Sequence, residues 1–196
     1  MLSANTSAPR IRSGPLTAAL TVSNSTRTGG FDVEPVALFP ARKDTLFDHL
    51  MLFFNGFSRL APEIAKKQID NLDRRQKHIQ TMVGFVDEGI GILQSENRPL
   101  REVGELLHDS WQLKRELADV VSTPEVDEIY QAARDTGAIC GKLLGAGGGG
   151  FMLLFVEPEK QAAVSERLES LIRVKIGPDE TGSKIVVYEP DGLENY

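Results

Sequence analysis

Cysteine is almost absent from this sequence of 196 residues, in which Cys140 is the single thiol. One cysteine excludes an intrachain disulfide, and its place in an apolar run predicts a small core residue in a reducing compartment. Long apolar runs are also lacking: the longest, Phe151 to Val156, has the length of a strand rather than of a membrane span. The N-terminus has no apolar signal core, so we expect a cytoplasmic protein that does not bind a membrane.

An excess of positive charge is lacking as well. The 22 lysines and arginines are outnumbered by 28 acidic residues, and the net charge of -6 argues against a nucleic-acid partner. The three histidines, His49, His78 and His108, are far apart and show no ligand spacing, so we predict no metal site. Hydrophobic residues make up 41% of the chain, which suffices for the core of a single domain.

Glycine, by contrast, is concentrated at one point. Five of the six residues from Gly145 to Gly150 are glycine, and apolar runs stand on both sides. Because each glycine loses much backbone freedom on folding, this density has a cause: close approach of the backbone to an anion or another loop, or a wide, flexible hairpin turn. A Walker A loop does not fit, since Leu143 stands where Ser or Thr would hold magnesium, and a dinucleotide fingerprint does not fit, since a strand follows. We predict an accessory wall of a phosphate site.

The spacing of apolar residues predicts an α+β fold, a helical bundle packed on a small, mainly antiparallel sheet. Helical periodicity indicates helices over residues 46–50, 58–69, 72–93, 100–120, 124–136 and 158–171. Extended apolar runs indicate strands over residues 51–54, 138–144, 151–156, 174–176 and 184–188. Residues 1–30 differ in composition and predict a poorly ordered or atypical leader, residues 31–190 form the domain, and residues 191–196 form a loose tail.

The glycine-rich stretch from Lys142 to Phe151, Lys-Leu-Leu-Gly-Ala-Gly-Gly-Gly-Gly-Phe, resembles the third, C-terminal motif of the GHMP small-molecule kinases. Residues 52–59, 108–114, 127–130 and 137–138 are similar to the heptose kinases of that family. Those enzymes phosphorylate D-glycero-D-manno-heptose 7-phosphate at the anomeric oxygen. The resemblance therefore implies a GHMP kinase C-terminal domain over residues 31–190, a small sugar phosphate as substrate, and ATP and Mg²⁺ as cofactors.

The resemblance extends over about residues 30–188 and includes neither the family's Pro-x-x-x-Gly-Leu-Gly-Ser-Ser-Ala loop, which wraps the ATP phosphates, nor its usual catalytic aspartate. We expect the substrate-side half of a kinase, with the N-terminal ATP-loop half missing, so that the chain alone is inactive. Its partner would be a complementary N-terminal kinase half or a second copy of itself. Two alternatives stay open: a non-catalytic dimerisation or regulatory module, and another GHMP kinase of the fucokinase or mevalonate kinase type.

By the same resemblance, four glycines would line the ATP cleft, where glycine N–H groups act as donors without side-chain obstruction: Gly145, Gly147, Gly148 and Gly149. No catalytic residue can be assigned.

Four further residues are candidates for binding the sugar phosphate. Arg59, near the start of a predicted helix, would hold the phosphate at the positive end of the helix dipole, or it is a surface arginine. Trp111 and Lys114 share one helical face, Trp111 as a sugar platform or a core anchor and Lys114 as a phosphate ligand. Lys142 either faces the ligand or is a solvated strand lysine; Arg115 is a weaker candidate than these four.

Overall fold

The computed structural model describes residues 20–25, 29–56 and 61–178. The chain divides into two compact units, one of residues 1–36 and 178–196 and one of residues 37–177. In the first unit, β1 (Leu20–Ser25) and β2 (Phe31–Val36) form an antiparallel hairpin, so a strand lies within the predicted leader. The predicted strand at 184–188, the predicted tail at 191–196 and the candidate Arg59 lie outside the described residues.

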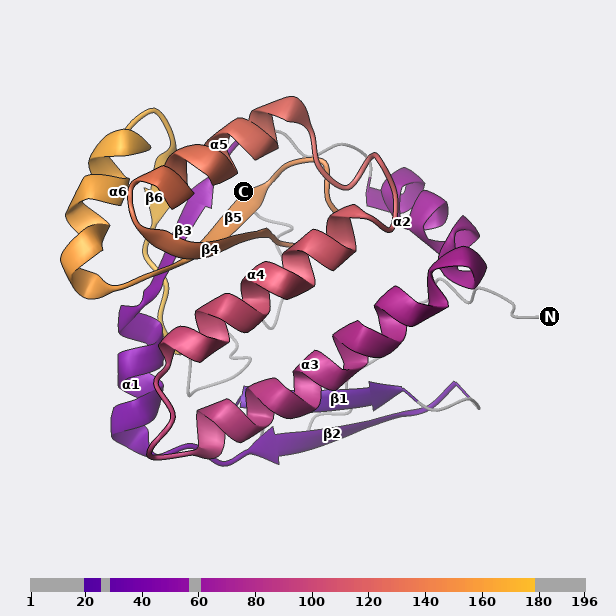
Figure 1. Ribbon diagram of the computed structural model, residues 1–196, viewed down its shortest axis with the longest axis horizontal. Coiled ribbons are helices and arrows are strands. Elements are labelled where there is room, and N and C mark those ends of the chain that lie inside the picture. Colours follow the sequence, from indigo (N-terminus) through magenta and orange to yellow (C-terminus); the bar gives the residue numbers. More distant parts are fainter. Residues whose placement is uncertain (1–19, 26–28, 57–60, 179–196) are drawn as a thin grey trace, which may run out of the picture. The chain divides into compact units, whose positions relative to one another are not determined.

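The second unit contains a four-stranded antiparallel sheet in the order β4-β5-β3-β6 (Figure 1). Its strands are β3 (Leu50–Phe54), β4 (Ala138–Leu143), β5 (Phe151–Val156) and β6 (Ile172–Val174). The two strands that flank the glycine cluster pair with each other, Leu143 opposite Met152, as their apolar composition predicts. The glycine-rich segment is therefore a connection between the edge strand β4 and its antiparallel neighbour β5.

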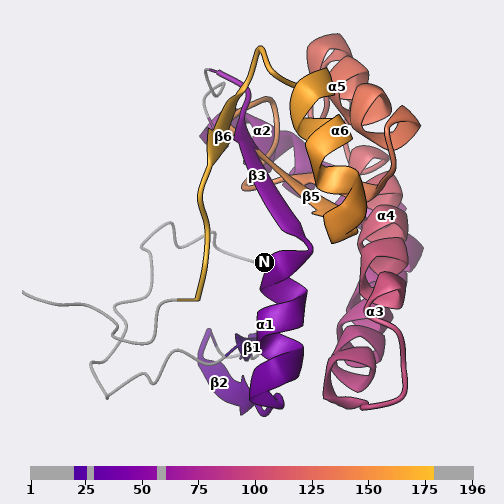
Figure 2. The ribbon, with the colours of Figure 1, turned by 90° about the vertical axis from the view of Figure 1, so that its left-hand side faces the viewer.

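Six α-helices and two 3-10 turns complete the described part of this unit. They are α1 (Pro40–Asp48), α2 (Ala61–Asp70), η1 (Leu72–Arg75), α3 (Gln76–Gln94), α4 (Arg101–Arg115), α5 (Pro124–Asp135), η2 (Pro158–Lys160) and α6 (Gln161–Arg167). Helices α4 and α5 pack on β4, and α3 packs beside α4. Figure 2 shows α4, α5 and α6 on the same side of β3 and β6. The predicted α+β fold is confirmed.

Helix α5 shows how the sequence sets an element's limits. The Thr123 hydroxyl accepts a hydrogen bond from the Val126 N–H at 3.3 Å, and Pro124 occupies the first turn. Gly137, two residues beyond the helix, has φ +111°, a conformation that side chains disfavour. Both limits agree with the sequence prediction.

The main core lies between the sheet and the helices. Its largest members are Trp111, Phe53, Met51, Leu143 and Met152, all almost completely buried. Two glycines permit the close packing: a Cβ at Gly104 on α4 would lie 2.8 Å from Ile139 Cγ2, and one at Gly141 would lie 2.7 Å from Leu154 Cδ2. The packing explains why α4 can lie so near β4.

Several predicted elements differ from the structure. The helix expected over 46–50 is the longer α1, and the one expected over 158–171 is η2 followed by α6, which ends at Arg167; the strand expected over 174–176 is β6, at 172–174. Two further differences lie in the longest helices. The helix expected over 100–120 ends at Arg115, and residues 117–121 instead form turns that press against the glycine loop. The helix expected over 72–93 begins as the 3-10 turn η1 before α3 continues. In both places apolar residues continue at helical spacing, so periodicity alone does not reveal the change.

Candidate functional site

The glycine loop, residues 144–150, joins β4 to β5 and is held at its base by backbone hydrogen bonds. The Leu144 N–H donates to the Phe151 carbonyl at 2.8 Å, and the Asn55 N–H donates to the Gly150 carbonyl at 2.9 Å. On another side, Gln68 Nε2 of α2 donates to the Ala146 carbonyl at 2.7 Å. These contacts give the loop a defined shape, which does not agree with a wide, unsupported turn.

Two of the loop glycines allow the backbone of the loop to lie close to the backbone of another segment, at Val121. A Cβ at Gly147 would lie 2.6 Å from the Val121 carbonyl oxygen, and the Gly148 N–H donates to that same oxygen at 3.0 Å. In this conformation the Gly148 amide is bonded to the protein, and the predicted role of Gly148 in binding ATP stays a prediction. Gly147, Gly148 and Gly149 are buried, whereas Gly145 is exposed. Of the two explanations for the glycine density, close approach to another loop is the one observed.

Two lysines lie at the exposed end of this loop. Lys114 Nζ donates a hydrogen bond to the Gly145 carbonyl at 2.6 Å. Burial lowers the pKa of Lys114, and the nearby positive charge of Lys142 on β4 lowers it further. Neither ammonium group forms an ion pair with an acidic side chain of the described residues. Two like charges without a counter-charge create a positive potential at the loop, which favours an anion.

Trp111, the third candidate on α4 and β4, belongs to the core. Its side chain has 0% exposure and lies among the residues of the main cluster, so it presents no face to a sugar. Its Nε1 is buried and has no hydrogen-bond partner in the described part of the chain. Although Trp111 and Lys114 are at i, i+3 spacing, they have different surroundings. The Trp111 indole anchors α4 in the core, and the Lys114 ammonium lies at the loop.

Asn55 is a residue that the sequence analysis did not single out as a candidate, although it lies within residues 52–59, which resemble the heptose kinases. Asn55 is anchored to the loop by its backbone N–H, and its Oδ1 is buried without a partner among the described groups. A buried acceptor without a donor costs free energy, about 1–3 kcal/mol in mutational data.

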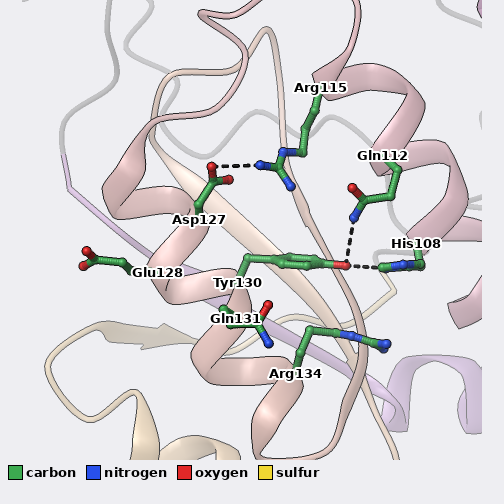
Figure 3. A pocket seen from close by; sticks show the side chains of 8 residues that line it. All are labelled: His108, Gln112, Arg115, Asp127, Glu128, Tyr130, Gln131 and Arg134. Carbon is green, nitrogen blue, oxygen red and sulfur yellow. Dashed lines mark hydrogen bonds and ion pairs between the residues drawn. The ribbon is translucent and has the colours of Figure 1, made fainter.

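A second feature is a hollow of about 620 Å³ between α4 and α5 (Figure 3). It is lined by polar side chains from the two helices: His108, Gln112, Arg115, Asp127, Glu128, Tyr130, Gln131 and Arg134. The sequence analysis did not predict the hollow, although five of its lining residues lie in the segments 108–114 and 127–130 that resemble the heptose kinases.

Most polar groups in the hollow bind one another. The Tyr130 hydroxyl is hydrogen-bonded to His108 Nδ1, and Gln112 Nε2 donates to it at 3.5 Å. Arg115, the weaker candidate for binding the sugar phosphate, donates a hydrogen bond to Asp127 Oδ2 at 2.8 Å, so its charge already has a partner within the protein. Burial raises the pKa of Tyr130 and is the main cause that lowers the pKa of His108. The network joins α5 to α4.

Comparison with known proteins relates this fold to kinases. The C-terminal family model of the GHMP kinases matches residues 93–173. The D-glycero-alpha-D-manno-heptose 7-phosphate kinase of Campylobacter jejuni is 32% identical over 112 residues, which is 57% of this chain and 33% of that protein. The bifunctional fucokinase/GDP-fucose pyrophosphorylase of Arabidopsis thaliana is 29% identical over 142 residues, 70% of this chain and 13% of that protein. The chain thus spans a third or less of these relatives.

Solved structures show the same fold. Mevalonate kinase from L. major in complex with R-mevalonate aligns with a TM-score of 0.61 and 18% identity over 78% of this chain and 47% of that one. A D-glycero-D-manno-heptose 1-phosphate kinase from Bacteriodes thetaiotaomicron aligns with a TM-score of 0.55 and 16% identity over 85% of this chain and 45% of that one. The motif, the matched family model and the shared fold all relate residues 93–173 to the C-terminal domain of the GHMP kinases.

Proposed function

We propose that this chain is the substrate-side half of an ATP-dependent sugar kinase that phosphorylates a heptose 7-phosphate at its anomeric oxygen. The main observation is the pair of ammonium groups, Lys114 and Lys142, beside the glycine loop and without an acidic partner among the described residues. The C. jejuni relative, which is 32% identical, bears the name of a heptose 7-phosphate kinase, which supports this substrate. A fucokinase-like or mevalonate-type reaction is the alternative within the same family.

Phosphoryl transfer depends mainly on positioning and charge stabilisation, so the roles of this chain are those of binding and orientation. Lys114 and Lys142 hold the phosphate of the sugar as point charges. Through its bond to Lys114, the Gly145 carbonyl fixes one ammonium group on the loop.

GHMP kinases use ATP, usually with Mg²⁺, but the residues described here do not by themselves fit either group. No cluster of three or more His, Cys, Asp or Glu side chains that could hold a metal ion is found within the described ranges. The Gly148 amide is bonded to Val121 and is not available to a phosphate. We therefore assign ATP and Mg²⁺ to a complementary kinase half and route no step through a metal held by this chain. Within the described ranges, no helix is both long and apolar enough to span a bilayer.

The edge of the sheet provides a surface for that complementary half. Phe54 of β3 is paired with Phe151 of β5 on one side and with Ile172 of β6 on the other. Phe151 and Ile172 are 41% and 64% exposed. The Phe54 and Phe151 rings lie 5.2 Å apart, which makes a continuous apolar row. The solved relatives named above are about twice as long as the matched part, since 45–47% of their length is covered. A folded kinase half is therefore the occupant that we propose for this row.

Calorimetric titration with heptose 7-phosphate tests the proposal. We expect binding that Lys114→Met and Lys142→Met each weaken about tenfold or more, because each substitution removes a hydrogen bond to a charged group. Lys160→Met, which removes an exposed lysine of η2, is the matched control and should leave binding unchanged. Micromolar binding of ATP–Mg²⁺ by the chain alone would contradict the assigned division between the halves. No binding of either compound would favour the non-catalytic module.

A further inference from the structure

Helix α3 has an apolar stripe that its own domain does not cover. One side of the helix packs on α4: Ile92 is buried, and a Cβ at Gly89 would lie 3.4 Å from Leu106 Cδ2. A neighbouring side carries four β-branched residues at positions 79, 83, 86 and 90. Val83 and Val86, the two central ones, are 59% and 48% exposed. Large exposed apolar residues in a row are typical of interaction sites.

The spacing of this stripe, Ile79-Val83-Val86-Ile90, is that of a coiled-coil seam. Its steps of four, three and four residues read the same in both directions. An antiparallel copy of the helix can therefore place Ile79 beside Ile90 and Val83 beside Val86, and the same contacts then occur twice about a two-fold axis. A surface that complements itself in this way is what a symmetric dimer requires.

The polar residues around the stripe fit the same arrangement. In the antiparallel register, Gln80 of one copy lies next to Asp87 of the other and can donate an amide hydrogen bond to it. Arg74 and Arg75, which precede α3, come near Glu96, which follows α3 in the second copy. None of these charged groups forms an ion pair within the described part of its own chain. Opposite charges at the two ends of one helix favour an antiparallel second copy over a parallel one.

We propose that the chain forms a symmetric dimer through an antiparallel pair of α3 helices. The stripe on α3 continues towards Ile69 on α2 and Leu72 on η1, which are 56% and 38% exposed and enlarge the apolar surface at the end of α3. The dimer does not depend on the kinase assignment, because none of the residues that we propose to bind the sugar phosphate belongs to α3.

Sedimentation velocity of the full chain over a range of concentrations tests the dimer. We expect reversible dimerisation and an increase of at least about tenfold in the dissociation constant for Val83→Lys, since a charge would be buried in the seam. Gly84→Lys is the matched control: it adds the same side chain at the next position, where a Cβ meets no atom within 4 Å, and we expect no change. Circular dichroism verifies that both variants fold. A monomer at every concentration, or equal effects of the two lysines, would overturn the proposal.

Disulfide trapping tests the antiparallel register, with Cys140 buried and giving no background. A mixture of Val83→Cys and Val86→Cys chains should cross-link readily, since these positions face each other in the dimer. Ile79→Cys alone should not, because the two copies of residue 79 are separated by about 16 Å along the helix axis, beyond the reach of a disulfide. Efficient cross-linking of Ile79→Cys would indicate a parallel pair and overturn the antiparallel register.

Discussion

Replacing Gly147 by alanine should destabilise the domain through two effects that the structure separates. The residue has φ +124°, which costs an L-residue about 1–3 kcal/mol, and a Cβ would lie 2.6 Å from the Val121 carbonyl oxygen and 2.9 Å from Val121 Cα. Because these are backbone atoms, the loop has to move, and the Gly148 hydrogen bond to Val121, worth about 0.5–1.5 kcal/mol, weakens. We expect a loss of about 3–5 kcal/mol in the free energy of unfolding.

Gly145→Ala is the matched control for this prediction. Gly145 also has a positive φ, +76°, but a Cβ there meets no atom within 4 Å. It should therefore cost only the strain, about 1–2 kcal/mol. Urea denaturation followed by circular dichroism gives both values, with the slope of the transition as a check on two-state behaviour. Equal losses for the two variants would refute the conclusion that backbone approach to Val121 explains the glycine at 147.

Three further predictions concern the core and the hollow. Gly104→Ala should lower the free energy of unfolding, measured by urea denaturation, by about 1–3 kcal/mol, because its Cβ would lie 2.8 Å from Ile139 Cγ2 and overpack the core. An unchanged denaturation midpoint would show that α4 can shift to make room. Burial lowers the pKa of His108 below 6.5, so its contribution to the free energy of unfolding is complete above pH 6.5 and is lost as the pH falls through the pKa of the folded protein. The variant His108→Gln should therefore lose less stability on acidification than the unchanged protein. An equal loss of stability in both proteins would contradict this prediction. Burial raises the pKa of Cys140 to about 12, so a thiol reagent at neutral pH should react only in denaturant; rapid reaction of the folded protein would indicate local opening.

The strands and helix limits were predictable where a local signal dominates. Thr123-Pro124 marks the start of α5, and the apolar runs on both sides of the glycines mark two paired strands. The end of α4 at Arg115 was not predictable, because it depends on the approach of residues 117–121 to Gly147, a contact that exists only in the folded domain.

The candidate site was predictable in part, for the same physical reason. The sequence located the glycine loop and both lysines, but only the fold brings the Lys114 ammonium to the Gly145 carbonyl. It could not separate Trp111 from Lys114, since spacing on a helix does not say which neighbour faces the core. The hydrogen bond of the Gly148 amide could not be predicted, because its acceptor, the Val121 carbonyl, is supplied by a remote turn.

The attachments of the glycine loop have a consequence for how the site forms. The loop is held by Asn55, Gln68 and Val121, three segments distant from it in sequence, through single hydrogen bonds rather than through a ladder. Contacts of this kind close long chain loops and contribute little individually, so we expect the site to assemble late in folding. It should also open before the sheet does: hydrogen exchange of the Gly148 amide should then proceed through a local fluctuation, at a rate independent of global unfolding. A protein with an intact circular dichroism spectrum could thus already have lost the anion site that we propose.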